Sequence, residues 1–137
     1  MTTLFTASVT AKGGRAGHVK SDDGVLDHSI VMPNQKKDGE AGTNPEQLFA
    51  AGYAACFGGA LEHVAKEQGI EIDSEVEGRV SLMKDESDGG FKLGVQLVVS
   101  ANGLEKEKAE ELVKAAHDFC PYSKATRGNI NVDLQVK

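Results

Sequence analysis

Most of the chain alternates hydrophobic and polar positions, a pattern typical of half-buried β-strands. Residues 4–33 hold three short runs that end at glycines or at Pro33, and they predict a three-stranded antiparallel start. Residues 70–86 and 91–103 form two longer runs joined by Ser-Asp-Gly-Gly, which predicts an antiparallel hairpin. The last nine residues, NINVDLQVK, alternate once more and predict a final strand.

Between the first strands and the hairpin, the hydrophobic spacing changes to three and four residues, which predicts a long helix. Asn44 can cap its N-terminus, Pro45 suits the first helical position, and Gln47 completes a capping box. Gly69 is expected to end it. Its apolar stripe consists of Phe49, Tyr53, Cys56, Phe57, Ala60, Leu61 and Val64.

The middle of this helix, AAGYAACFGGA, contains three glycines, and each costs about 1 kcal/mol relative to alanine in a helix interior. Close packing offsets such a cost, because small residues let another backbone approach. A floor of small residues around Cys56 would also leave room for a ligand.

Residues 104–120 predict a second helix, with Leu112, Ala116 and Cys120 on its apolar face. Pro121 is expected to end it, because the residue before a proline is pushed away from the α region. We therefore expect a single α+β domain over residues 1–137, with antiparallel sheet packed around two main helices.

Composition narrows the classes of function. A formal net charge of -6 without a basic stripe argues against nucleic-acid binding. No window reaches the roughly twenty apolar residues of a membrane span, so we expect a cytoplasmic protein. In a reducing cytosol, two lone cysteines are more often catalytic or redox-sensing than structural.

The two cysteines fall on the apolar faces of separate predicted helices. If both helices pack on one face of a sheet, the sulfurs of Cys56 and Cys120 can meet in the core and form a redox pair. The alternative is that each is a small buried hydrophobic residue, which for either cysteine taken singly is the commoner case.

The histidines near the cysteines give weaker signals. His117 and Cys120 have an H-x-x-C spacing, but a zinc site would need four ligands and pairs such as C-x-x-C. His63 follows Cys56 by seven residues, about 10 Å along a helix, which is too far for it to act as a base. We expect neither a metal nor a cofactor.

Two segments around the cysteines resemble a known family. TNPEQLFAAGYAACFGGALEHVA around Cys56 and CPYSKATRGNI around Cys120 are similar to the organic hydroperoxide resistance (Ohr) branch of the OsmC/Ohr family. GGRAGHVKSDDG resembles the arginine loop of that family. The resemblance covers essentially the whole chain, and CPYS, ATRGN and TNPEQLFA favour Ohr over the OsmC branch and the regulator-like relatives.

The resemblance implies an OsmC-like fold, an intertwined homodimer and a thiol peroxidase that acts on organic hydroperoxides. Cys56 would be the peroxidatic residue and Cys120 the resolving residue, with Arg15 and Glu46 as partners of the reactive thiol. A lipoylated protein or another dithiol would regenerate the enzyme. The rival hypothesis is a non-enzymatic thiol sensor or a small-molecule-binding module of the same fold.

Lowering the Cys56 pKa is not enough to explain a role for the arginine. A drop of about two units gains only about threefold in rate at pH 7, once the loss of nucleophilicity is counted. Arg15 would do more by stabilising the departing alkoxide, held in place by Glu46. Because Glu46 lies ten positions before Cys56, about 15 Å along a straight helix, we expect a bend or a restart near Gly52.

Other side chains have expected structural roles. Arg127 and Asn129 are expected to fix the loop after Cys120 or a dimer contact. Four aromatic side chains are expected in the core, where some could form an apolar wall that favours bulky alkyl peroxides: Phe49, Tyr53, Phe57 and Phe119.

Overall fold

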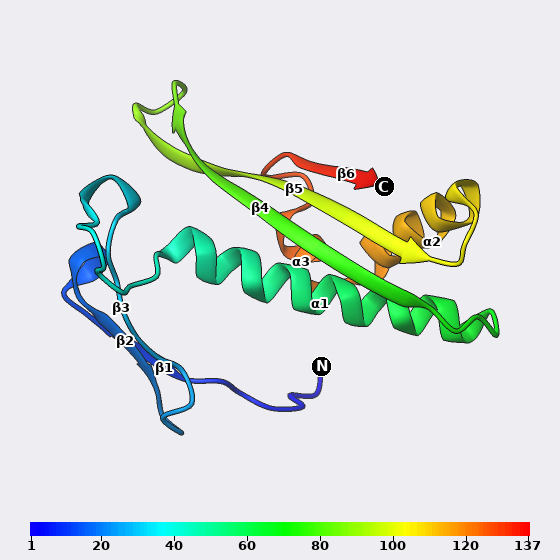
Figure 1. The fold of residues 1–137 in the computed structure, drawn as a ribbon, viewed down its shortest axis with the longest axis horizontal. Helices are drawn as coiled ribbons and strands as arrows, with labels where there is room; N and C mark the ends of the chain where they lie inside the picture. The colour runs from blue at the N-terminus through cyan, green and yellow to red at the C-terminus, as the bar shows by residue number, and fades with distance from the viewer. The chain divides into compact units, whose positions relative to one another are not determined.

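The computed structural model describes all residues, Met1–Lys137, and they divide into two compact units, Met1–Leu48 and Phe49–Lys137. Two three-stranded sheets and three α-helices make up the chain (Figure 1), so the α+β prediction is confirmed. None of the helices combines the length and the apolar character that crossing a lipid bilayer requires.

The first unit contains an antiparallel sheet in the order β1-β2-β3, as predicted. Its strands are β1 (Val9–Lys12), β2 (His18–Ser21) and β3 (Asp27–Ser29), shorter than the alternating runs suggested. Two 3-10 turns interrupt the loops, η1 (Gly14–Ala16) and η2 (Pro33–Gln35).

The turn between β1 and β2 has a conformation that depends on glycine. Gly13 and Gly14 have φ of 81° and 59°, in the left-handed region that favours glycine. A Cβ at Gly17 would lie 1.7 Å from the carbonyl oxygen of Lys12. These glycines make a tight loop that carries Arg15 at its centre.

The segment that leads into the long helix is attached to this sheet. Ile30 is buried, and its N–H donates to the carbonyl of Gly17 at 2.8 Å. Ile30 also forms a parallel bridge with Thr43, whose N–H donates to Ser29 at 2.9 Å. These bonds bring the start of the helix close to the Arg15 loop, although the two are far apart in sequence.

Helix α1 (Pro45–Glu67) begins at the predicted cap and ends near the predicted Gly69. The side-chain oxygen of Asn44 accepts the N–H of Gln47 at 2.8 Å. The reciprocal capping-box bond is replaced, because the Gln47 side chain accepts from the Thr43 hydroxyl instead.

The predicted bend or restart near Gly52 is wrong, because α1 is α-helical without interruption from Pro45 to Glu67 (Figure 1). Gly52 has a packing role instead. A Cβ there would lie 2.6 Å from Tyr122 Oη, so the missing side chain makes room for the tyrosine ring. Close packing, the structural alternative for the small residues, therefore holds at Gly52.

The sheet of the second unit has the order β4-β5-β6. Strands β4 (Asp73–Asp85) and β5 (Gly90–Asn102) form the predicted antiparallel hairpin. Strand β6 (Val132–Val136) instead pairs parallel to β5, so the prediction of purely antiparallel sheet was wrong here. The helical segment between β5 and β6 carries the chain back to the same end of the sheet, as parallel pairing requires.

That crossover contains α2 (Lys106–Phe119) and a short α3 (Pro121–Thr126). Pro121 ends α2 as predicted, but it also occupies the first position of α3, a helix that the sequence pattern did not predict. Proline is well suited to that position, because its fixed φ is helical and its missing N–H would have no helical partner.

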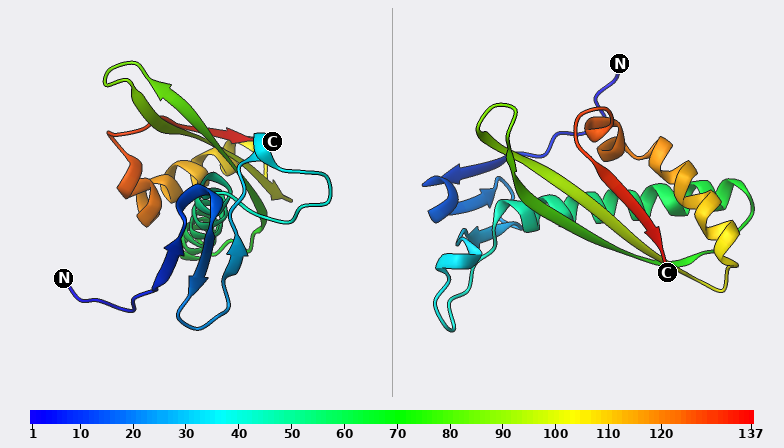
Figure 2. Two further views of the ribbon diagram at one scale, coloured as in Figure 1. Left: turned by 90° about the vertical axis from the view of Figure 1, so that its left-hand side faces the viewer. Right: turned by 90° about the horizontal axis from the view of Figure 1, so that it is seen from above.

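The helices of this unit cover one face of its sheet (Figure 2). The buried helical side chains include Phe57, Leu61 and Leu112, each with no exposed area. Apolar residues line the inner face of the strands at alternate positions: Val76, Val80, Val95, Leu97, Val99, Val132, Leu134 and Val136.

Candidate functional site

The two cysteines meet in the core of the second unit. Cys56 Sγ on α1 and Cys120 Sγ lie 3.7 Å apart, and both thiols are free. Cys120 is fully buried, whereas Cys56 is partly exposed. The prediction that the sulfurs can meet is confirmed, and their unequal exposure makes Cys56 the one that solvent reaches.

Cys120 lies at the bend between the end of α2 and the start of α3, which we call the elbow. Its N–H donates to the carbonyl of Ala116 at 2.8 Å, and its carbonyl accepts the N–H of Lys124 at 3.0 Å. Its extended backbone, with φ -64° and ψ 126°, is the conformation favoured before a proline. Both helices therefore hold the backbone of this residue in place.

The surroundings of Cys56 have opposing effects on the pKa of its thiol. Burial raises the pKa of Cys56 above its usual range, and the neighbouring Cys120 raises it further. The backbone N–H of Tyr122 donates to the sulfur and lowers the pKa, with a smaller effect than burial. In the reduced pair Cys56 is therefore mainly a thiol at neutral pH, the reverse of the lowered pKa considered from sequence.

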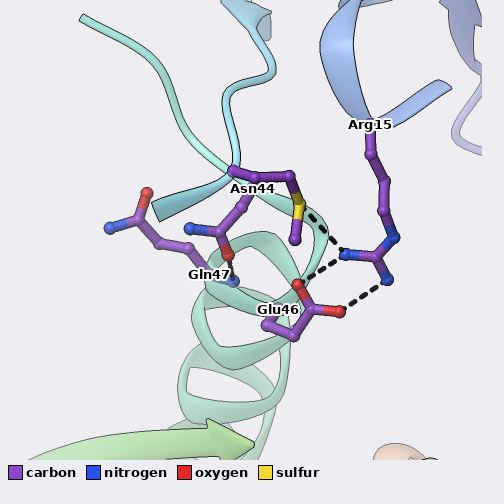
Figure 3. A network of polar contacts seen from close by, with 5 residues as sticks. Arg15, Asn44, Glu46 and Gln47 are labelled. Carbon is purple, nitrogen blue, oxygen red and sulfur yellow. Dashed lines mark hydrogen bonds and ion pairs between the residues drawn. The ribbon is translucent and has the colours of Figure 1, made fainter. Parts of the chain in front are cut away.

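Arg15 and Glu46 form a two-pronged ion pair within the first unit (Figure 3). Arg15 Nη2 donates to Glu46 Oε1 at 2.7 Å, and Nη1 donates to Oε2 at 3.0 Å. Nη1 also contacts the thioether sulfur of Met32 at 3.6 Å. A fork of this kind fixes the plane of the guanidinium as well as its position.

The ion pair also sets the charge of both partners. The hydrogen bonds from Arg15 hold the pKa of Glu46 below its usual range, and the same bonds raise the pKa of Arg15. Glu46 lies in the first turn of α1, where the helix dipole favours a negative charge. Glu46 has a side-chain exposure of 13% against 44% for Arg15, so the guanidinium keeps one side open to solvent.

The other residues singled out from the sequence have structural contacts. His63 stacks on Phe119 with ring centroids 4.3 Å apart, and its Nε2 lies 3.2 Å from Glu67. The prediction of Phe119 in the core is wrong, because this residue is 48% exposed. Arg127 donates to the carbonyl of His117, which ties α2 to the end of α3 as expected. No group of three or more His, Cys, Asp or Glu side chains is placed to hold a metal ion.

A buried chain of polar side chains beside the cysteines was missed from sequence. Tyr53 Oη lies 2.8 Å from Ser123 Oγ and 3.3 Å from Thr126 Oγ1. Ser123 Oγ lies 2.8 Å from His117 Nδ1. Burial lowers the pKa of His117, and the charge of Arg127 lowers it further. The only sequence signal was the CPYS string itself, because the partners of Ser123 are distant in the chain.

Comparisons with known proteins cover nearly the whole chain. Residues 36–135 match the OsmC-like protein family. The organic hydroperoxide resistance protein OhrB of Bacillus subtilis is 78% identical over 134 residues, 98% of each chain, and OhrA of the same organism is 55% identical over 135 residues, 97% of this chain and 96% of OhrA. The crystal structure of OhrB, at 76% identity, has a TM-score of 0.96 over 98% of this chain and 100% of that one. The chain therefore belongs to the OsmC family, in its organic hydroperoxide resistance branch.

Proposed function

We propose that the protein is a thiol peroxidase that reduces organic hydroperoxides to alcohols. The Cys56 thiolate attacks the distal peroxide oxygen, the O–O bond breaks, and the alkoxide takes a proton and leaves as the alcohol. Cys56 becomes a sulfenic acid, which Cys120 converts to a disulfide with release of water. The observation that carries this proposal is the 3.7 Å separation of the two free sulfurs.

The assignment of roles to the two thiols follows their exposure. A peroxide must reach the attacking sulfur, and only Cys56 is partly exposed. The buried Cys120 is protected from direct oxidation and lies beside the sulfur that it would resolve. We therefore assign Cys56 as the peroxidatic residue and Cys120 as the resolving residue.

The substrate class is proposed from the relatives and from the aromatic side chains. OhrB and OhrA are organic hydroperoxide resistance proteins. Phe49, Tyr53 and Tyr122 form an aromatic cluster with ring centroids 5.6 Å to 6.2 Å apart. Tyr122 follows Cys120 by two residues and donates its N–H to Cys56. Tyr53 is buried, but Phe49 and Tyr122 are partly exposed, and these two rings suit an alkyl or aryl peroxide better than hydrogen peroxide.

Arg15 and Glu46 are proposed to assist the first step. The guanidinium would stabilise the negative charge that develops on the departing alkoxide oxygen, which is a larger effect than a modest change in thiol pKa. Glu46 would hold the guanidinium in a fixed orientation, as the two hydrogen bonds between them support.

Regeneration requires an external dithiol. We propose a lipoyl-type reductant in the cytoplasm, where the thiol pool is reducing. Because Cys120 is buried, the incoming thiolate would attack the sulfur of Cys56 and release Cys120 as a thiol. A second attack by the same dithiol then frees Cys56.

We also propose that the protein acts as a homodimer. The β4–β5 hairpin exposes large apolar side chains, Leu82, Met83 and Phe91, that a second copy would cover. Light scattering after size-exclusion chromatography tests this, because a monomeric mass at micromolar concentration would contradict it.

The second candidate is a thiol sensor that uses the same cysteine pair without turnover. Turnover separates the two functions. With excess dihydrolipoamide, an enzyme consumes many equivalents of cumene hydroperoxide per protein, and it loses this activity in Cys56→Ser. A sensor consumes one equivalent, and that result would overturn the proposal.

A further inference from the structure

We infer that Tyr53, Ser123 and His117 are positioning residues for the second step, in which Cys120 attacks the sulfenic acid of Cys56. This inference rests on the proposed function. It assigns a role to the buried polar chain, which the first step of the reaction does not use.

The polar chain and the thiol pair connect the same segments of the protein. Tyr53 precedes Cys56 by three residues on α1, so the two side chains lie on the same helix face. His117 precedes Cys120 by three residues on α2, and Ser123 follows it by three on α3. The Tyr53–Ser123 bond of 2.8 Å therefore joins the same two segments that the sulfurs join at 3.7 Å.

The bond between His117 and Ser123 closes the elbow around Cys120. At 2.8 Å it connects the end of α2 directly to α3, on either side of the cysteine. Arg127 adds a second connection, from the end of α3 to the carbonyl of His117. The angle of the elbow sets the direction in which the Cys120 side chain leaves the backbone.

Because these hydrogen bonds are buried, they permit few alternative placements of the side chains. Tyr53 and Ser123 have no exposed area, Thr126 has 5%, and no buried side-chain nitrogen or oxygen lacks a partner. Within the core, a hydroxyl that moves away leaves its partner without a hydrogen bond, so the alternative arrangements are costly. The network therefore favours one relative placement of α1 and α3.

The second step needs such a placement. The Cys120 thiol gives up its proton, its sulfur attacks the Cys56 sulfur, the S–O bond breaks, and the hydroxide leaves with that proton as water. The sulfurs must close from 3.7 Å to a bond of about 2.05 Å with a restricted dihedral angle. A second peroxide competes with this step, because it oxidises the waiting sulfenic acid to a sulfinic acid.

The test measures the partition between resolution and overoxidation. Tyr53→Phe and Ser123→Ala remove hydroxyls, and Val113→Ala is the control, because it removes buried volume from α2 but no hydrogen-bonding group. Each reduced protein receives about five equivalents of cumene hydroperoxide, and intact mass separates the disulfide, a loss of about 2 Da, from the sulfinic acid, a gain of about 32 Da. Thermal unfolding of all variants accounts for general loss of stability.

We expect the parent and Val113→Ala to give disulfide. Ser123→Ala should raise the ratio of sulfinic acid to disulfide about tenfold, a size consistent with a misalignment of the two sulfurs well under 1 Å. Tyr53→Phe should raise this ratio less, because the bond between Ser123 and His117 remains. In a Cys120→Ser background the reaction stops at the sulfenic acid, so the first step can be measured alone. There, Ser123→Ala should slow sulfenic acid formation far less than it slows disulfide formation when Cys120 is present.

The outcomes separate this inference from the proposed function. If the parent forms no disulfide, the proposed function itself fails. If the parent forms disulfide and both hydroxyl variants partition as Val113→Ala does, only the inference is wrong. Should Ser123→Ala not fold, Tyr53→Phe decides the question, because it retains the ring and the buried volume of the core.

Discussion

Arg15 and Glu46 are joined by two parallel hydrogen bonds, from Nη2 to Oε1 at 2.7 Å and from Nη1 to Oε2 at 3.0 Å. The arginine comes from a loop shaped by glycines and the glutamate from the first turn of α1, and the bridge between Ile30 and Thr43 holds the two segments together. The pair is therefore set by the backbone of the first unit, and the guanidinium is oriented before any substrate binds.

Removal of the guanidinium should slow the first step. We expect Arg15→Ala to lower kcat/KM for cumene hydroperoxide about 100-fold, the usual cost of losing a donor that stabilises developing charge, and Glu46→Gln to lower it about tenfold. Arg79→Ala is the matched control, because Arg79 also pairs with a glutamate, Glu77, on an exposed strand. Equal effects of Arg15→Ala and Arg79→Ala would contradict a catalytic role for Arg15.

The rate of sulfenic acid formation should rise with pH. Because burial raises the pKa of Cys56, the thiolate fraction increases about tenfold per pH unit through neutral pH and levels off only above the pKa of an ordinary cysteine, about 8.5. Cys120→Ser should move this midpoint to lower pH, since Cys120 raises the pKa of Cys56. Stopped-flow measurements between pH 6 and pH 10 test both statements, and a plateau below pH 7 would refute the first.

Stability should depend on pH through the same group. A folded-state pKa above the unfolded value of about 8.5 stabilises the fold below that pH, and this contribution is lost as the pH rises through the folded value. Cys56→Ser should therefore flatten the alkaline part of the stability curve measured by urea unfolding. An unchanged alkaline slope would mean that other groups dominate.

Two glycines of α1 should respond oppositely to alanine. Gly52→Ala places a Cβ 2.6 Å from Tyr122 Oη, so the ring must shift and the protein should be destabilised. At Gly58 the nearest neighbour of a Cβ is Val76 Cγ2 at 3.8 Å, an ordinary contact, so Gly58→Ala should stabilise the fold by about 1 kcal/mol. Thermal unfolding measures both, and a stabilised Gly52→Ala would contradict the packing described.

Loss of the helix cap should have a moderate cost. The Asn44 side chain accepts the N–H of Gln47, so Asn44→Ala should lower the free energy of unfolding by about 1 kcal/mol. Asn102→Ala is the control, because Asn102 makes only an exposed bond to Asp73. Similar losses of unfolding free energy in both variants would show that the cap contributes no more than an exposed side-chain hydrogen bond.

The sequence predicted α1 well because its signals are local. Asn44, Pro45 and Gly69 define the ends through their own backbone preferences, and the apolar spacing defines the face that is buried. The meeting of Cys56 and Cys120 followed from the same periodicity, applied to two helices on one sheet.

The errors concern features set by distant parts of the chain. Alternation predicted β6 as a strand, but its parallel direction depends on the helical crossover and on pairing with β5. A glycine suggested a break at Gly52, whereas the reason for it is the ring of Tyr122, 70 residues later in the chain. The partners of Ser123 were invisible for the same reason, since Tyr53 is also 70 residues away.

The central claim is that Cys56 reacts with the peroxide and Cys120 resolves it. The most direct test is the intact mass of the reduced protein and of Cys120→Ser after one equivalent of cumene hydroperoxide, beside the same dose of hydrogen peroxide. We predict a loss of about 2 Da in the parent and a gain of about 16 Da in the variant, at far lower doses of the organic peroxide. No mass change in either protein would contradict the claim and leave the cysteines as buried core residues.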